Sequence, residues 1–140
     1  MEELVLTVEQ CKHLISLGLD ISDANFCHHH YKNDYEDYFK IEKLSDCKRE
    51  YFIDNYKFLK DIDIVPTYTL HEIFEKLPDH IVYNNKYYSL IINFNECWIV
   101  CISVENNKYI LNIYSLIGDI LKASYDMLCW VIENGYLKTK

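Results

Sequence analysis

Apolar side chains recur every three or four residues near the N-terminus: Val8, Cys11, Leu14 and Ile15. This spacing places them on one face of a helix, which we expect over residues 8–17. Thr7 and Gln10 stand at the spacing of a capping box, in which each side chain hydrogen-bonds the backbone of the other residue. Gly18 follows at the position where many helices end in a left-handed conformation.

A second helix is expected over residues 70–77. Its apolar positions have the same spacing: Leu70, Ile73, Phe74 and Leu77. Thr69 and Glu72 form another capping-box pair before it. Pro78 ends the segment, because proline lacks the backbone N–H that a helix needs and clashes with the preceding turn.

The longest helix is expected at the C-terminal end, over residues 116–133, with Ser115 as its cap. One face of this segment carries mainly apolar side chains: Ile117, Ile120, Leu121, Ser124, Met127, Leu128 and Val131. Such a face packs against a protein core. Asn134 and Gly135 follow as a typical helix end.

Four segments have the β-branched and aromatic side chains typical of strands: residues 24–31, 87–94, 97–104 and 108–114. Short connections join the last three, and strands joined so tightly pair antiparallel, because a parallel pair needs a long crossover. The pattern predicts an α+β fold in which an antiparallel meander packs against two to three helices. Since no linker-like segment interrupts the chain, we expect a single domain over residues 1–140.

Residues 32–63 fit both the two-residue period of a strand and the 3.6-residue period of a helix. In residues 38–41, and in part of residues 51–58, the side chains alternate in the way that places them on opposite faces of a strand. The same region has apolar side chains at helical spacing: Leu44, Tyr51, Phe58 and Ile62. We favour a pair of strands here.

Composition narrows the class of protein. The 140 residues are 50% hydrophobic and 15% aromatic, which is typical of a packed globular chain rather than a disordered one. Thirteen tyrosines stand against three glycines, and the net charge is −8. A chain this acidic repels phosphate backbones, so we expect no nucleic-acid partner. The three isolated glycines also exclude a glycine-rich phosphate-binding loop.

The acidic N-terminus and the short apolar runs predict a cytoplasmic protein. Met1-Glu2-Glu3 is acidic, whereas a signal peptide begins with basic residues and a longer apolar run. The longest apolar run elsewhere, residues 97–102, is far too short to span a membrane, so we expect no membrane partner. In a reducing cytoplasm the six cysteines are expected to be free thiols.

One run of side chains has metal-binding chemistry: Cys27, His28, His29 and His30. Because alternate residues of a strand share a face, His28 and His30 are the candidate metal ligands, while Cys27 and His29 point the other way. A third ligand has to come from elsewhere, such as His71, His80 or an acidic side chain. No second cluster has the spacing of a zinc motif, and a half-exposed polar strand explains the same residues.

Other motifs lack the partners that catalysis needs. His71-Glu72-Ile73-Phe74-Glu75 has Glu75 where a zinc-protease helix has its second histidine. Cys97 and Cys101 share a strand face about 13 Å apart, too far to be joined to each other or to one metal ion. No local motif sets a thiol beside histidine and an orienting group. We therefore predict no catalytic residue and no cofactor, and favour a protein that is not an enzyme.

Several short motifs carry a resemblance to a known family: Thr7-Val8-Glu9-Gln10, Leu17-Gly18-Leu19-Asp20, Pro66-Thr67-Tyr68-Thr69-Leu70 with Leu77-Pro78, and Ser124-Tyr125-Asp126-Met127-Leu128-Cys129-Trp130 with Glu133-Asn134-Gly135-Tyr136-Leu137. They are similar to motifs of small uncharacterised proteins encoded by gut bacteria and their phages or mobile elements. The resemblance covers the two ends and the middle helix. It implies a cytoplasmic setting in a phage or prophage, and it assigns no activity.

Three functional hypotheses follow. The first is a non-enzymatic accessory protein that binds another protein, in the setting of a phage–host interaction; tyrosine suits such interfaces because its body is apolar and its tip polar. The second is a metal-binding protein or small enzyme centred on residues 27–30. The third is a small-ligand-binding module with a tyrosine-lined pocket.

Overall fold

The computed structural model describes residues 4–32, 34–51, 64–93, 95, 98–103, 109–114 and 119–137. Within them the fold is α+β, with antiparallel strands and a C-terminal helix, as the sequence predicts. The chain divides into two compact units, Met1–Glu72 and Ile73–Lys140, and α4 (Leu70–Lys76) crosses the boundary between them. The single domain over residues 1–140 stays a prediction.

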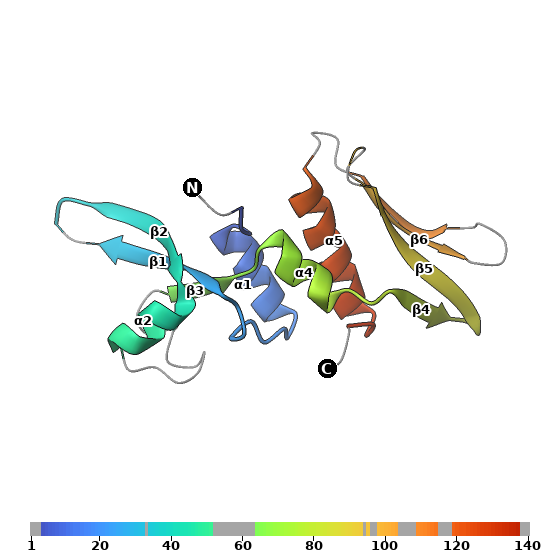
Figure 1. Ribbon diagram of the computed structural model, residues 1–140, viewed down its shortest axis with the longest axis horizontal. Coiled ribbons are helices and arrows are strands. Elements are labelled where there is room, and N and C mark those ends of the chain that lie inside the picture. The colour runs from blue at the N-terminus through green and yellow to red at the C-terminus, as the bar shows by residue number, and fades with distance from the viewer. Residues whose placement is uncertain are drawn as a thin grey trace. The chain divides into compact units, whose positions relative to one another are not determined.

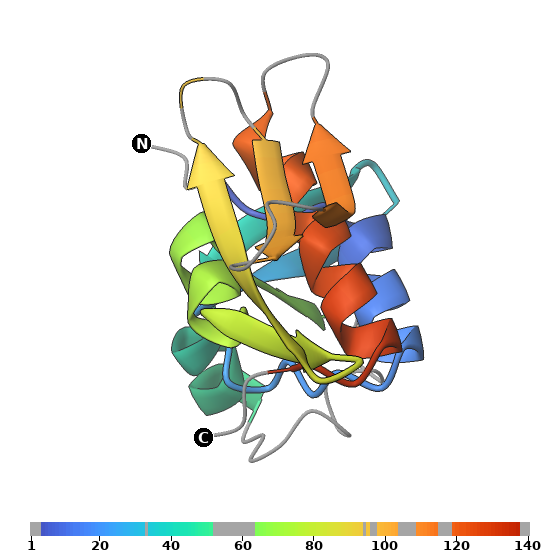
Figure 2. The ribbon, with the colours of Figure 1, turned by 90° about the vertical axis from the view of Figure 1, so that its right-hand side faces the viewer.

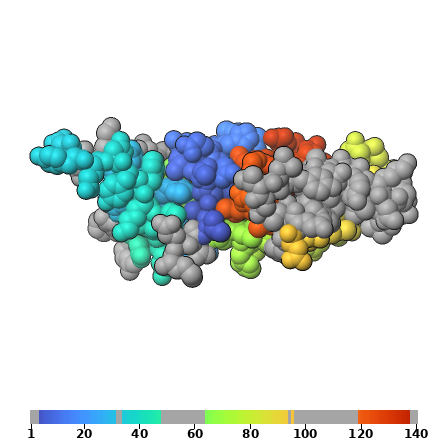
Figure 3. Space-filling model, turned by 90° about the horizontal axis from the view of Figure 1, so that it is seen from above, coloured from blue at the N-terminus to red at the C-terminus, as the bar shows by residue number. Residues whose placement is uncertain are grey.

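Within its described residues, the first unit is organised by a three-stranded antiparallel sheet (Figure 1). Its strands stand in the order β2 (Asp37–Lys43), β1 (Phe26–Lys32) and β3 (Ile64–Thr67). Pro66, in a strand that the sequence pattern did not predict, is tolerated because β3 lies at the edge of this sheet. The connection between β1 and β2 projects beyond the rest of this unit in the space-filling view (Figure 3), and Tyr35 within it is exposed.

Two helices pack on this sheet: α1 (Val8–Ser16) contacts β3, and α2 (Leu44–Tyr51) contacts β2 and β1. The start of α1 confirms the expected capping box. Thr7 Oγ1 accepts a hydrogen bond from the backbone N–H of Gln10 at 3.1 Å, and Gln10 Oε1 accepts one from the N–H of Thr7 at 2.9 Å. Gly18 has a φ of 96°, a conformation that glycine adopts without strain.

Residues 32–63 contain one strand of the expected pair, followed by a helix. Residues 38–41 lie in β2 as expected, although the side chains of residues 38, 39 and 40 are all exposed rather than alternately buried. The chain then enters α2, which ends at Tyr51, and residues 52–63 lie outside the described residues, so the second strand, expected over part of residues 51–58, stays a prediction. Leu44 and Cys47 are buried three positions apart, which shows that burial of one helical face decides the conformation here.

The described part of the second unit holds a four-stranded antiparallel sheet with the order β4 (His80–Tyr83), β5 (Lys86–Asn93), β6 (Trp98–Ser103) and β7 (Tyr109–Tyr114). The last three strands form the expected meander, and Figure 2 shows them side by side. Strand β4 was not predicted. It joins β5 through Asn84 and Asn85, whose φ values are 50° and 63°. A two-residue hairpin of this type needs positive φ at both positions, and asparagine tolerates it.

The C-terminal helix α5 (Ile120–Glu133) packs on β6 and β7 (Figure 2). It begins later than expected: Asp119 is its N-cap and accepts a hydrogen bond from the N–H of Lys122 at 3.1 Å. Ser115, the expected cap, lies outside the described residues. The buried side chains of α5 are Ala123, Ser124, Met127, Leu128 and Val131, and four of these five belong to the predicted apolar face.

The expectation of free thiols is confirmed as far as the described side chains reach. Within the described side chains, four cysteines are free thiols: Cys11, Cys27, Cys47 and Cys129. Cys97 and the side chain of Cys101 fall outside that part of the chain. None of the described helices has the length and apolar character needed to cross a membrane.

Candidate metal centre

Strand β1 presents two different sets of side chains, because alternate residues of a strand face opposite sides of the sheet. His28 and His30 lie on one face, and Cys27, His29 and Tyr31 lie on the other. This division is the one that the sequence pattern predicts. The two faces have different surroundings, and those surroundings decide what each histidine can bind.

His28 is committed to a hydrogen bond inside the protein. Its Nε2 lies 2.6 Å from the carbonyl oxygen of Leu6, which also accepts a hydrogen bond from Thr67 Oγ1 at 3.0 Å. Since a carbonyl oxygen only accepts, His28 Nε2 carries the hydrogen and cannot bind a metal ion, and Nδ1, which keeps its lone pair, belongs to no metal-ligand group among the described residues. His28 therefore anchors the segment that precedes α1 to the sheet.

His30 lies nearer the end of the hairpin. Its Nε2 pairs with Asp37 Oδ1, and its ring stacks on that of Phe39 with the centroids 4.5 Å apart. In the part of the chain that the structure describes, no third ligand joins His28 and His30, and neither His71 nor His80 enters a metal-ligand group. The predicted pair is thus held by hydrogen bonds and ring stacking.

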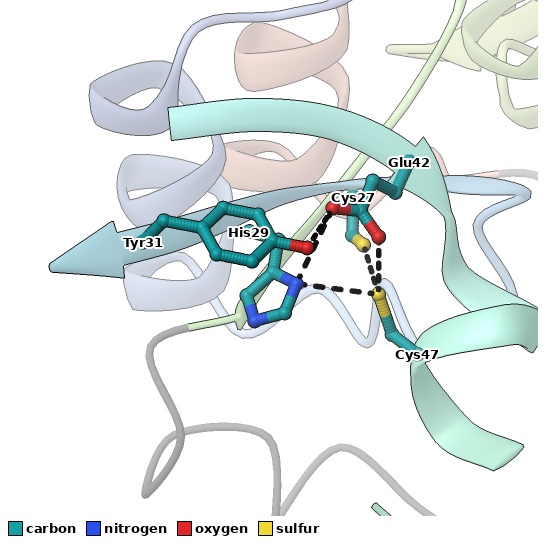
Figure 4. Close-up of polar contacts among 5 residues, drawn as sticks. All are labelled: Cys27, His29, Tyr31, Glu42 and Cys47. Carbon is teal, nitrogen blue, oxygen red and sulfur yellow. Dashed lines mark hydrogen bonds and ion pairs between the residues drawn. The ribbon is translucent and has the colours of Figure 1, made fainter. Parts of the chain in front are cut away.

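The opposite face of β1 brings together His29, Glu42 and Cys47 (Figure 4). One ligand atom from each of these residues lies within 4.8 Å of the other two. Cys47 Sγ is 3.9 Å from His29 Nδ1 and 3.7 Å from Glu42 Oε2, and His29 Nδ1 is 3.5 Å from Glu42 Oε1. A sulfur, a nitrogen and a carboxylate therefore converge on one point.

Local folding explains how these three residues meet. Antiparallel pairing sets Glu42 of β2 directly opposite Cys27 of β1, on the face that also carries His29. Helix α2 starts immediately after β2, and its first turn carries Cys47 back toward the sheet. The backbone N–H of Leu44 donates to the carbonyl of Asn25 at 2.9 Å, which ties the beginning of α2 to the strand end beside the site.

The three ligands are shielded from solvent to different degrees. The His29 side chain is 3% exposed and the Glu42 side chain 19% exposed, and Cys47 is fully buried. A largely buried carboxylate beside thiols is costly to desolvate, and a shared cation offsets that cost. A cation bound at this point would add to the hydrogen bonds that Glu42 accepts from Tyr31 and Cys47.

Two further side chains border the group. Cys27 Sγ lies 3.5 Å from Cys47 Sγ, and the Tyr31 hydroxyl donates a hydrogen bond to Glu42 Oε1 (Figure 4). The Tyr31 ring packs on that of His29 with the centroids 4.2 Å apart. Burial raises the pKa of the Cys27 thiol, and its hydrogen bond with Cys47 and the negative charge of Glu42 raise that pKa further. With no cation beside it, Cys27 is a neutral thiol.

The same residue types occur in thiol catalysis, but the geometry differs. In a relay of thiol, imidazole and carboxylate, one ring nitrogen faces the nucleophile and the other faces the carboxylate. Here the same atom, His29 Nδ1, faces both Cys47 and Glu42. Because one nitrogen faces both partners, no proton can pass from the thiol through the imidazole to the carboxylate. The three side chains instead surround a common point, so this group fits metal binding better than nucleophilic catalysis.

The sequence pattern located the strand but favoured its other face. The available signal was the thiol of Cys27 two positions from the imidazole of His29, a mixed donor pair on a single face. Glu42 and Cys47 carried no signal of their own. Their role depends on the pairing register of β2 and on the presence of α2, which the pattern left undecided.

Comparison with protein-family models, with curated proteins and with solved structures finds no match. The resemblance to small proteins of gut bacteria and their phages therefore stays a prediction. The interpretation of the site rests on its geometry and on the chemistry of its ligands.

Proposed function

We propose that this chain is a metal-binding protein that holds a zinc-type transition-metal ion at His29, Glu42 and Cys47. The observation that carries the proposal is the convergence of three different donor atoms within 4.8 Å of one another. Burial of the imidazole and the thiol adds support, because a shielded ligand set keeps its ion from exchanging readily with water.

The donor set selects the class of metal. Thiolate, imidazole and carboxylate are the ligands of zinc, whereas magnesium and calcium take oxygen ligands. In a tetrahedral site with zinc bond lengths, neighbouring ligand atoms lie about 3.4 to 3.8 Å apart. The shortest distances among the three residues are 3.5, 3.7 and 3.9 Å, with Glu42 approaching His29 through Oε1 and Cys47 through Oε2. With a single Glu42 oxygen, all three ligand atoms lie within 4.8 Å of one another, so the side chains have to close in slightly around an ion.

The position of the ligands favours a structural role for the ion. They come from three consecutive elements, β1, β2 and α2, so that one ion ties the hairpin to the helix that follows it. Structural sites of this kind contribute directly to folding, because the unfolded chain offers no preformed site. A metal ion here holds the first turn of α2 against the sheet.

The protein-binding hypothesis is supported by an observation in the second unit. Val82, Tyr87 and Ile91 are large apolar side chains that are 49%, 56% and 43% exposed. Val82 faces Tyr87 across the β4–β5 pair, and Ile91 follows on the same face of β5. An exposed apolar face accepts many kinds of partner, whereas the ligand group in the first unit specifies its ligand by chemistry. Metal binding is therefore the function that the structure supports best.

Two neighbouring histidines provide a matched test. Untagged wild-type protein and the variants His29→Gln and His28→Gln are to be titrated with zinc and analysed for bound metal, with circular dichroism to confirm folding. We expect about one equivalent in the wild type and in His28→Gln, whose amide keeps a donor where His28 Nε2 stood. His29→Gln loses the Nδ1 ligand and should bind less than a tenth of that amount. A folded wild type that binds no zinc overturns the proposal, and so does full binding by His29→Gln.

A further inference from the structure

We propose that Cys27 is the fourth ligand, so that the complete centre contains two thiolates, one imidazole and one carboxylate and is selective for thiophilic ions such as zinc, cobalt and cadmium. This inference rests on the metal centre proposed above. It adds the residue that closes the site and the class of ion that it selects.

The position of Cys27 supports its inclusion. Its Sγ lies 3.5 Å from Cys47 Sγ, and two thiolates bound to one zinc ion in a tetrahedral site lie about 3.8 Å apart. Cys27 stands two positions before His29 on the same face of β1, opposite Glu42 in the register. It is fully buried, so a thiolate at this position needs a cation rather than water as its partner.

Binding requires one adjustment. Cys27 Sγ contacts Cys47 but does not belong to the three-residue group whose ligand atoms all lie within 4.8 Å of one another. The sulfur therefore has to move toward the centre of the three-residue group. A cysteine side chain places its sulfur by a single torsion, and β1 is held by pairing with both β2 and β3, so the sulfur can move while the strand remains in register.

The chemistry of binding is a proton exchange. The thiols of Cys27 and Cys47 lose one proton each to the solvent as two metal–sulfur bonds form, while His29 and Glu42 bind through a nitrogen and an oxygen lone pair. Two thiolates and one carboxylate exceed the charge of a divalent ion by one unit. The charge balance is the same for every divalent ion, so it is the softness of sulfur that disfavours magnesium and calcium, which select oxygen ligands.

Cobalt is the probe for the number of thiolates, because its sulfur-to-metal charge-transfer absorption reports them directly. Wild-type protein, Cys27→Ala and the control Cys11→Ala are to be titrated with cobalt, and the protons released are to be counted in weakly buffered solution. Cys11 is a matched control because it is also a buried free thiol in the first unit, but it hydrogen-bonds Thr67 instead.

We expect the wild type and Cys11→Ala to show equal charge-transfer bands and to release about two protons per ion. Cys27→Ala should keep a band of about half the intensity and release about one proton. If Cys27→Ala does not fold, Cys27→Ser provides a closer match in size and is expected to give the same halved band. A full band with two protons in either folded variant overturns the role of Cys27 and leaves the metal centre standing. A folded wild type that gives no band overturns both proposals.

Discussion

The two faces of β1 place histidines in opposite situations. On the face of His28, the surrounding chain supplies a hydrogen-bond acceptor, the carbonyl of Leu6. On the face of His29, it supplies further ligands, Glu42 and Cys47. The two neighbouring histidines thus differ in their surroundings. His28 meets a carbonyl oxygen that accepts its N–H, whereas His29 meets two further side chains whose potential metal-ligand atoms converge on a common point.

This contrast shows that the count of histidines in a run says little about metal binding. The face with two histidines is satisfied by the protein itself, through Leu6 and Asp37. The face with only one histidine gathers sulfur, nitrogen and oxygen. The elements that follow β1 decide the difference, because β2 and α2 bring their side chains to one face only.

Metal removal should produce the largest effect, and it should act through the face of His29 alone. If free zinc exceeds the dissociation constant a thousandfold, bound zinc raises the free energy of unfolding by about 4 kcal/mol. Urea denaturation of the wild type with and without a chelator measures this difference. Cys47→Ala, which lacks a ligand, should unfold at the same urea concentration in both conditions. Equal midpoints for the folded wild type with and without zinc would contradict the assignment.

The next effect belongs to the other face and should be independent of metal. His28→Phe keeps a ring but removes one of the two donors to the buried Leu6 carbonyl, which still accepts from Thr67 Oγ1, so we expect a loss of about 1.5 kcal/mol in the free energy of unfolding. His28→Gln restores a donor and should recover part of that loss. Both values should stay the same when chelator is added. A chelator-dependent loss in His28→Phe would show that the two faces are coupled.

A smaller effect is expected from the hydroxyl that orients Glu42. Tyr31→Phe removes the hydrogen bond to Glu42 Oε1 but keeps the ring against His29. Losing such a supporting bond typically weakens metal affinity about tenfold, which is about 1.4 kcal/mol. Zinc titration against a competing chromophoric chelator measures it. Tyr38→Phe, which changes the exposed ring stacked on Tyr31, is the control and should keep the wild-type affinity.

The smallest effect should come from His30. Its partner Asp37 is 62% exposed, and ion pairs at such positions contribute about 1 kcal/mol or less. His30→Ala should therefore change the free energy of unfolding by no more than about 1 kcal/mol and leave zinc binding unchanged. Denaturation and zinc titration of the same preparation test both points. A loss of zinc binding would restore His30 as a ligand.

Local signals predicted much of the fold because they act within a few residues. The capping boxes at Thr7 and Thr69 follow from hydrogen bonds between positions three apart, and both are formed. The meander of β5, β6 and β7 follows from short connections between apolar runs. Strand β4 was missed because it has four residues and its turn uses two asparagines instead of glycine. Helix α2 was missed because its few apolar positions fit both periods.

The metal centre shows where local signals end. The sequence by itself determined that Cys27 and His29 share a face, since the two-residue period of a strand leaves no alternative. It did not determine which face of β1 gathers further ligand atoms. Only the tertiary structure decided that Glu42 lies opposite Cys27 and that Cys47 returns on the first turn of α2. The physical reason is that strand register and helix packing minimise the free energy of the whole unit, in which the burial of Leu44 and Cys47 outweighs the ambiguous local pattern.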